Sequence, residues 1–351
     1  MAVFNVAPIV QSLHQLRNDW RAAQKRSLEP GGRELPSRDA VAQIVEALKG
    51  ALFPMRLGPP DLRQESEDFY VGHTLDSALH ALLAQVRLEL GHVARVQEQE
   101  GWEAGGVESR AVAAVQAFAA SLPDIRRLLD SDVMAAFHGD PAARSVDEVL
   151  LCYPGVLAMI HHRLAHRWYA LDLPLLARIA AELSHAQTGI DIHPGARIGA
   201  SFFIDHGTGV VVGETAVIGE RVRLYQAVTL GAKRFPTDAT GHVQKGLPRH
   251  PVLEDDVVIY AGATVLGRVT IGRGAVIGGN VWLTHSVPAG GNVTQADLHQ
   301  EARVLGGAVR GIAGPPTASN RSHGPDLPDL PHSNDATDAT DTANTPIARR
   351  A

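Results

Sequence analysis

The sequence has a single cysteine, Cys152, among 351 residues, so no disulfide can form within one chain. A chain without internal disulfides fits a reducing compartment, and we expect a cytoplasmic protein. Residues 1–20 also lack the basic segment followed by an apolar run that marks a secretory signal. Cys152 lies in an apolar stretch with helical spacing, which predicts a position in the core.

Long apolar runs and an excess of basic charge are missing as well. No stretch approaches the roughly 18 consecutive apolar residues that a membrane span needs. The net charge is −6, whereas proteins that bind the phosphate backbone of nucleic acids need a basic surface. We therefore expect neither a membrane protein nor a nucleic-acid-binding protein.

Apolar residues recur at helical spacing through residues 1–187. Ser145 followed by Glu148 has the pattern of a capping box and predicts the start of a helix. Pro154 is expected to kink or divide that helix, and Pro174 to begin another. The pattern predicts an all-helical N-terminal domain, and we interpret its early helices as an assembly surface.

From Ile190 onward, apolar residues recur every six positions, which is neither helical nor strand spacing. Small or branched residues form a second row four positions later. Six-residue repeats are typical of a parallel β-helix, in which each repeat supplies one short strand and one turn. The pattern predicts such a domain over residues 188–290. The main series comprises Ile192, Ile198, Ile204, Val212, Ile218, Leu224, Leu230, Leu253, Ile259, Val265, Ile271 and Ile277.

The six-residue period is interrupted twice. The first interruption is a slip of two residues within 205–211, and the second, residues 232–252, must form a loop that leaves the stack. Stacked repeats accept insertions only as protrusions, often on the functional face. We therefore expect the site at these interruptions, which carry the polar residues Asp205, His206, Arg249 and His250.

The end of the chain has a different composition. Residues 314–351 are rich in Pro, Ser, Asn, Asp and Thr, which predicts a disordered tail. Residues 291–313 form a C-terminal segment with a helix-like stretch at 296–306. The predicted fold class is therefore α+β: a helical domain, a parallel β-helix of hexapeptide repeats, and a disordered tail.

Several motifs occur in a fixed order: GDPA at 139–142, DIHP at 191–194, DHGTGVVVGET at 205–215, VTLG at 228–231 and RHP at 249–251. Together they resemble the serine O-acetyltransferases over roughly residues 138–290. The resemblance implies a left-handed β-helix, homotrimers or dimers of trimers with active sites between subunits, acetyl-CoA as donor and no metal. It also implies acetyl transfer to the hydroxyl of L-serine, giving O-acetyl-L-serine and CoA, the first step of cysteine biosynthesis from serine.

A serine hydroxyl is protonated at neutral pH, so a base must remove its proton as the oxygen attacks the thioester. Histidine suits this task because its pKa lies near neutrality, and we assign the role to His206, with direct transfer to serine. The resemblance gives Asp191 as the partner that fixes the imidazole tautomer. A carboxylate that only caps a turn is the alternative for Asp191.

Serine is a zwitterion, so its ammonium calls for carboxylates and its carboxylate for a planar, bidentate cation. By resemblance, Asp140 and Asp205 bind the ammonium and Arg249 binds the carboxylate, while His250 completes the acceptor site through a hydrogen bond. A turn before a helix is the alternative interpretation of Asp140. For Arg249 the alternative is a solvated loop cation.

The donor is expected to lie along the β-helix, in the cleft between two subunits. Backbone groups near Gly231 and Ala261 are candidates to pair with pantetheine, and Lys233 is a candidate to contact the CoA phosphates. Because L-cysteine differs from serine only at the side-chain atom, we expect it to inhibit at the serine site. The chain ends in Ala351, so the C-terminal isoleucine by which many relatives dock into cysteine synthase is absent, and binding of that enzyme stays open.

Other functions fit parts of the pattern. A related β-helix acyltransferase would take a sugar or xenobiotic acceptor, but the carboxylates and the arginine favour an amino acid. A β-helix carbonic anhydrase would bind zinc through three histidines between subunits, and an inactive scaffold would not need His206. His162 and His166 lie four residues apart, but Arg163 stands where zinc proteases have glutamate, which favours packing or a solvated face.

Overall fold

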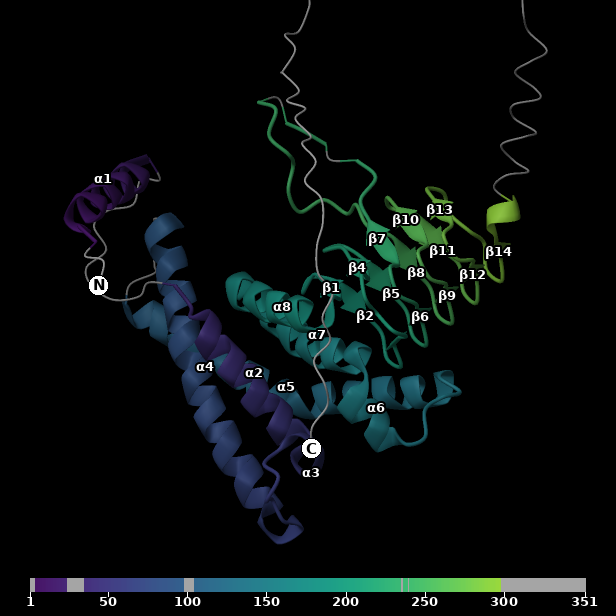
Figure 1. The fold of residues 1–351 in the computed structure, drawn as a ribbon, viewed down its shortest axis with the longest axis horizontal. Coiled ribbons are helices and arrows are strands. Elements are labelled where there is room, and N and C mark those ends of the chain that lie inside the picture. The colour runs from purple at the N-terminus through teal and green to yellow at the C-terminus, as the bar shows by residue number, and fades with distance from the viewer. Residues whose placement is uncertain (1–3, 24–34, 98–103, 235, 239, 298–351) are drawn as a thin grey trace, which may run out of the picture. The chain divides into compact units, whose positions relative to one another are not determined.

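The structure is a computed structural model that describes residues 4–23, 35–97, 104–234, 236–238 and 240–297. These residues belong to one compact unit. The helices of the described part are α1 (Ala7–Ala23), α2 (Arg38–Leu52), α3 (Pro54–Leu57), the 3₁₀ helix η1 (Gln64–Ser66), α4 (Glu67–Gln97), α5 (Ala104–Gly139), α6 (Val146–Cys152), α7 (Pro154–Ala170) and α8 (Pro174–Thr188) (Figure 1).

Helix boundaries follow the capping and proline signals. Ser145 caps α6 by accepting a hydrogen bond from the Glu148 backbone N–H at 3.0 Å, and the Glu148 carboxylate accepts one from the Arg144 N–H. Pro154 divides the predicted long helix, because α6 ends at Cys152 and α7 begins at Pro154. Pro174 begins α8, as expected. The prediction of a helical N-terminal region is confirmed.

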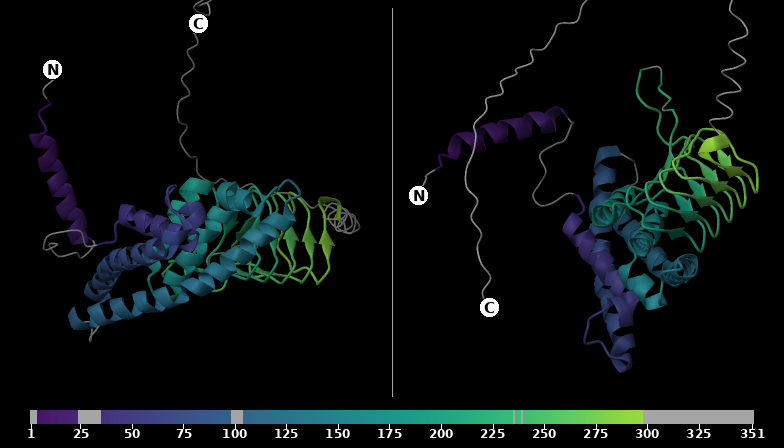
Figure 2. Two further views of the ribbon diagram at one scale, coloured as in Figure 1. Left: turned by 90° about the horizontal axis from the view of Figure 1, so that it is seen from below. Right: turned by 45° about the vertical axis from the view of Figure 1, so that its right-hand side comes forward.

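The chain then winds into successive coils, and the short strands of these coils form three parallel sheets (Figure 2). Sheet A has the order β1-β4-β7-β10-β13, sheet B β11-β8-β5-β2, and sheet C β14-β12-β9-β6-β3. The strands are β1 (Asp191–Ile192), β2 (Arg197–Ile198), β3 (Phe203–Ile204), β4 (Val211–Val212), β5 (Val217–Ile218), β6 (Arg223–Leu224), β7 (Thr229–Gly231), β8 (Val252–Leu253), β9 (Val258–Ile259), β10 (Thr264–Leu266), β11 (Thr270–Ile271), β12 (Val276–Ile277), β13 (Trp282–Leu283) and β14 (Asn292–Val293).

The six-residue series forms the interior of these coils. Every member is the second residue of a two- or three-residue strand, and all except the partly buried Ile198 are at most 5% exposed. Aliphatic side chains therefore stack on one another from coil to coil, which explains why the period is six. The predicted left-handed parallel β-helix of hexapeptide repeats is confirmed as the fold of this region.

Strand register locates both interruptions. Val211 pairs with Thr229, so a regular coil takes 18 residues, but Asp191 pairs with Val211, 20 residues on. The two extra residues lie in the turn between β3 and β4. Thr229 pairs with Thr264, 35 residues on, because the loop between β7 and β8 leaves the stack and returns.

A buried ion pair joins the helices to the first coil. The Arg163 guanidinium of α7 bonds the Asp132 carboxylate of α5 at 3.0 and 3.1 Å, and the two side chains are 5% and 2% exposed. The same guanidinium donates to the carbonyl oxygens of Ile198 and Gly199, and Asp132 accepts from the Phe202 N–H. These bonds fix α5 and α7 against the turn between β2 and β3.

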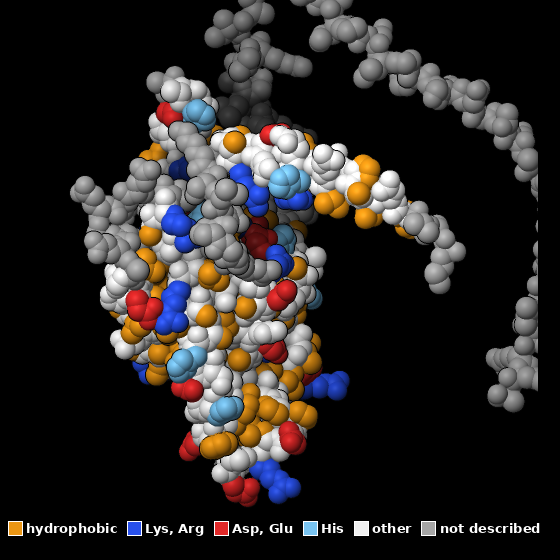
Figure 3. All heavy atoms as spheres, turned by 90° about the vertical axis from the view of Figure 1, so that its left-hand side faces the viewer, with side chains coloured by type: hydrophobic (Ala, Val, Ile, Leu, Met, Phe, Trp, Pro, Cys, Tyr) orange, Lys and Arg blue, Asp and Glu red, His pale blue; other side chains and the backbone are white. Residues whose placement is uncertain are grey.

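Helix α1 buries none of its residues, and hydrophobic side chains along it face solvent (Figure 3). Among the described residues, no helix is long and apolar enough to cross a membrane. The predicted disordered tail, 314–351, lies outside the described residues, as does most of the helix-like stretch at 296–306.

Candidate active site

The first interruption forms a tight turn at the corner between sheets C and A. His206 adopts a left-handed backbone conformation, φ 60°, which is uncommon for a residue with a side chain. The turn is closed by a hydrogen bond from the Gly207 N–H to the Asp205 carbonyl oxygen at 2.7 Å. The His206 side chain is 71% exposed, and its Nε2 lies 3.9 Å from Oδ1 of Asp205. The turn thus presents the imidazole to solvent.

The start of helix α7 packs closely against this corner. A Cβ atom on Gly155 would lie 2.3 Å from the Ile204 carbonyl oxygen, so only glycine allows the start of α7 to approach β3 this closely. Tyr153, the N-cap residue of α7, donates its hydroxyl hydrogen to Asp140 Oδ2. The structure thereby brings Asp140, which follows α5, into the same corner as Asp205 and His206.

The two carboxylates of this corner have different partners. Arg223 Nη2 donates to Asp205 Oδ2 at 2.9 Å, and its guanidinium lies 4.9 Å from the Phe203 ring centroid. The hydrogen bonds from Tyr153 and the Ala142 N–H hold the pKa of Asp140 below its usual value. The bond to Asp140 raises the pKa of Tyr153 to about 12, so its hydroxyl stays a donor. With two carboxylates and one guanidinium, the corner carries a net charge of −1 when His206 is neutral.

Asp191 lies on β1 of sheet A, next to this corner, and is half-buried. Its backbone N–H donates to the Val210 carbonyl oxygen at 2.9 Å. No hydrogen bond or ion pair joins Asp191 to His206 within the described ranges, whereas Asp205 does approach the imidazole. The pairing of Asp191 with His206 stays a prediction.

Arg249 and His250 occupy the opposite edge of sheet A, at the corner with sheet B. The Thr215 hydroxyl oxygen accepts from both backbone N–H groups, Arg249 at 2.9 Å and His250 at 3.1 Å. Arg268 Nη1 donates to the Thr215 and His250 carbonyl oxygens. The end of the long loop is therefore held by hydrogen bonds to the turn between β4 and β5, which contains Glu214 and Thr215.

The His250 ring has one clear hydrogen-bonding state. Its Nδ1 lies 3.0 Å from the Thr215 N–H and 2.9 Å from the Thr215 hydroxyl, so Nδ1 acts as the acceptor. Burial, followed by repulsion from Arg249, lowers the pKa of His250 to about 4. The neutral ring therefore carries its proton on Nε2, where it can serve as a hydrogen-bond donor.

The predicted CoA residues fall at both edges of sheet A. Lys233 lines a cavity of about 310 Å³ together with Arg234, Arg249 and Arg268, and no carboxylate is among the described residues that line it. Such a cavity suits phosphate groups. The Gly231 carbonyl oxygen already accepts from the Gly267 N–H, and that of Ala261, at the corner between sheets C and A, from the Asn280 N–H.

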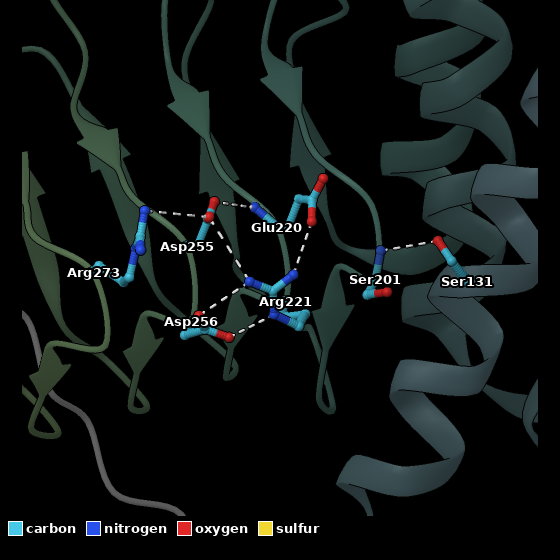
Figure 4. A network of polar contacts seen from close by, with 7 residues as sticks. All are labelled: Ser131, Ser201, Glu220, Arg221, Asp255, Asp256 and Arg273. Carbon is cyan, nitrogen blue, oxygen red and sulfur yellow. Dashed lines mark hydrogen bonds and ion pairs between the residues drawn. The ribbon is translucent and has the colours of Figure 1, made fainter.

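The third corner, between sheets B and C, carries a network of charged side chains (Figure 4). Arg221 donates to both carboxylate oxygens of Asp256, at 2.7 and 3.1 Å, and to Glu220 at 2.8 Å. Arg273 lies 4.0 Å from Asp255, which accepts from the Glu220 N–H. Each of the three carboxylates lies within 4.0 Å of a guanidinium on its own or a neighbouring coil, so these pairs stabilise the stack.

Some expectations about single residues need correction or completion. The prediction of a core position for Cys152 was wrong: Cys152 is the last residue of α6 and is exposed, because the buried side of this short helix is at Val149. His162 is fully packed rather than solvated, and its ring stacks on His166 with centroids 5.6 Å apart. Glu214, Thr215, Tyr153 and Tyr169 were not predicted as site residues. The first two stand within the quoted motif, but no sequence signal identified the tyrosines.

A β-helix of hexapeptide repeats with a histidine, two carboxylates and a basic cavity at its corners is typical of a hexapeptide-repeat acyltransferase. Residues 250–285 match the family described as bacterial transferase hexapeptide (six repeats). The "Serine acetyltransferase, plasmid" of Synechococcus elongatus is 58% identical over 275 residues, which are 78% of this chain and 86% of that protein. The chain belongs to the serine acetyltransferase family.

Other relatives agree. The serine acetyltransferase of Bacillus subtilis is 48% identical over 162 residues, 46% of this chain and 70% of that relative. Among solved structures, serine acetyltransferase 1 of Entamoeba histolytica in complex with L-cysteine matches with a TM-score of 0.62 and 36% identity, covering 72% of this chain and 86% of that one.

Proposed function

We propose that this chain transfers the acetyl group of acetyl-CoA to the hydroxyl of L-serine, forming O-acetyl-L-serine and CoA as the first step of cysteine biosynthesis. The observation that carries the proposal is the distribution of charge at the two edges of sheet A. One corner, with Asp140, Asp205 and Arg223, has a net charge of −1. The other, with Glu214, Arg249 and Arg268, has a net charge of +1. Serine, as a zwitterion, complements both.

In the proposed reaction, His206 removes the hydroxyl proton as the serine oxygen attacks the thioester carbonyl carbon. The C–S bond then breaks, CoA leaves as the thiolate, and the imidazolium returns the proton to it. This sequence of bond changes and proton transfers requires neither a covalent acetyl-enzyme intermediate nor a metal ion. Asp191 is the proposed partner that stabilises the imidazolium, and His250, with its proton on Nε2, is the proposed donor to the acceptor or the developing oxyanion.

The acceptor site is proposed to form between two copies of the chain. Ammonium and carboxylate are carried by the same carbon of serine, whereas the two charged corners lie on opposite edges of sheet A, roughly 10 Å or more apart at ~3.3 Å per strand residue. A neighbouring copy that brings its Arg249 corner to the His206 corner would complete the site. A homotrimer, alone or as a dimer of trimers, provides such contacts symmetrically.

The same arrangement gives acetyl-CoA a place between copies. Lys233, with Arg234 and Arg268, would hold its phosphates at one edge, while backbone groups near Gly231 and Ala261 would face the pantetheine from the two sides. L-Cysteine, which carries the same ammonium and carboxylate, is proposed to inhibit at the serine site. The relative from Entamoeba histolytica whose structure contains L-cysteine supports this proposal.

The decisive experiment replaces the proposed base. His206→Ala is expected to lower turnover with serine at least ~10²-fold, the usual range for general-base assistance, without changing the oligomer. His80→Ala removes a 74% exposed histidine on α4 and serves as the control with unchanged activity. L-Cysteine added to the wild-type assay is expected to raise the KM for serine. Near-normal turnover of the His206 variant, or no CoA release with serine, would refute the proposal.

A further inference from the structure

Helix α7 reaches the Arg249 corner through a second tyrosine. Tyr169, in the last turn of α7, donates its hydroxyl hydrogen to Glu214 Oε1 at 3.0 Å. The other oxygen of the same carboxylate, Oε2, accepts from Arg249 Nη2 at 2.6 Å. One carboxylate thus connects the helical domain to the guanidinium that is proposed to bind the acceptor.

The pair is shielded from solvent. The Arg249 and Glu214 side chains are 25% and 23% exposed. Partial burial works to raise the pKa of Glu214, but the hydrogen bonds from Arg249 and Tyr169 outweigh it and lower that pKa. Burial, with the bond to Glu214, raises the pKa of Tyr169, so its hydroxyl remains a donor at neutral pH. Both contacts therefore persist under working conditions.

Arg249 has little else to fix its guanidinium. It stands at the end of the loop that leaves the stack, and its only other side-chain hydrogen bond among the described residues runs from Nη1 to the Leu247 carbonyl oxygen at 3.3 Å. A planar, bidentate cation binds a carboxylate well only when its plane is set beforehand, because otherwise ordering the side chain opposes binding. Glu214 and the Leu247 carbonyl each take one Nη hydrogen, so the Nε–H and the second hydrogen of Nη2 remain available to the acceptor.

We propose that Tyr169 and Glu214 are positioning residues that hold the Arg249 guanidinium ready for the carboxylate of the acceptor. The inference rests on the proposed function, in which Arg249 binds that carboxylate. It assigns to the helical domain a part in acceptor recognition, since Tyr169 belongs to α7. Removing either contact weakens the binding of serine, whereas the transfer step at His206, on the other edge of sheet A, is left intact.

The first test is a split between KM and kcat in the full-length enzyme. Tyr169→Phe deletes one oxygen and is expected to raise the KM for serine about 3- to 10-fold, and Glu214→Gln at least about 10-fold. Both are expected to change kcat and the KM for acetyl-CoA by less than about threefold. Tyr70→Phe, the same deletion at a half-buried tyrosine of α4, is the control and leaves all three constants unchanged.

A role confined to fastening α7 to the β-helix would give a different result. Tyr169→Phe would then lower Tm without raising the KM for serine, and that outcome overturns the proposal. The second test combines Glu214→Gln with Arg249→Lys. Because Glu214 acts through Arg249, the double variant is expected to raise the KM for serine little more than Arg249→Lys alone. Fully multiplicative effects would contradict the inference.

The carboxylate site and the positioning role can be distinguished by experiment. If Arg249→Lys by itself leaves the KM for serine unchanged, the proposed carboxylate site is wrong. If Arg249→Lys raises that KM but neither Tyr169→Phe nor Glu214→Gln does, only the positioning role is wrong.

Discussion

At the scale of single residues, the site depends on a few side chains that hold others in place. Thr215 is the clearest case, because its hydroxyl binds two backbone N–H groups of the loop end and faces His250 Nδ1. Tyr153 has the same relation to Asp140. Each predicted substrate-binding residue is thus held by a neighbouring side chain, which restricts the geometry before any substrate arrives.

Gly213 provides a residue-scale prediction. A Cβ atom there would lie 2.0 Å from His250 Cδ2 and 2.1 Å from Nε2, so the ring must move if alanine is introduced. Gly213→Ala is expected to lower kcat/KM for serine at least about tenfold, because a displacement of about 1 Å in a site can cost that much or more. Steady-state kinetics with purified variants measures it. Gly72→Ala is the matched control, since a Cβ on this exposed helical glycine meets nothing within 4 Å. Unchanged serine kinetics in Gly213→Ala would show that His250 does not rest on Gly213 during catalysis.

At the scale of elements, the sequence predicts what depends on local pattern. The β-helix follows from apolar residues six apart, and the helix ends from Ser145, Pro154 and Pro174. It does not predict contacts between distant segments. Tyr169 and Glu214 are 45 residues apart, and only the packing of α7 against the first coils brings them together. The position of Cys152 could not be predicted for a similar reason, since apolar spacing does not show where a short helix turns toward solvent.

Glu89 gives a prediction for one element. Helix α8 begins without a side-chain cap, and the Glu89 carboxylate of α4 replaces it by accepting the Leu175 and Leu176 N–H groups at 2.8 and 2.9 Å. Glu89 is 2% exposed, so Glu89→Ala leaves one buried and one partly buried donor unpaired and is expected to cost about 2–3 kcal/mol of stability. Chemical denaturation measures this change. Glu46→Ala removes a 66% exposed carboxylate from its ion pair with Lys49 and is expected to cost at most about 0.5 kcal/mol. Equal effects of the two variants would contradict the capping role.

At the scale of the whole molecule, the two corners of sheet A differ in charge, one negative and one positive, whereas the charged side chains of the third corner pair with one another along the coils. This arrangement suits a small zwitterion bound between copies and leaves the third corner to stabilise the coils. Another property of the whole molecule is a group of histidines that burial keeps neutral. Burial is the first cause of a lowered pKa in His161, His162, His166, His193 and His250.

These histidines predict that the protein loses stability in weak acid. In the unfolded chain each has a pKa near 6.5, whereas in the folded chain the pKa is lower, about 4 for His193 and His250. Between those values the unfolded state binds more protons, so the free energy of unfolding falls as the pH drops from about 6.5 toward about 4 and is unaffected above that window. Carboxylates with lowered pKa add to the loss of stability only nearer pH 4 and below.

His162 is fully buried, and neither of its ring nitrogens has a hydrogen-bond partner in the described structure. His162→Leu is therefore expected to reduce the slope of stability against pH without lowering stability at pH 7.5. Denaturant titrations from pH 4 to 8 at constant ionic strength measure the slope, with the exposed His80→Ala as control. A wild-type protein equally stable at pH 7.5 and 4.5, or a His162→Leu variant with an unchanged slope, would show that burial does not keep these rings neutral.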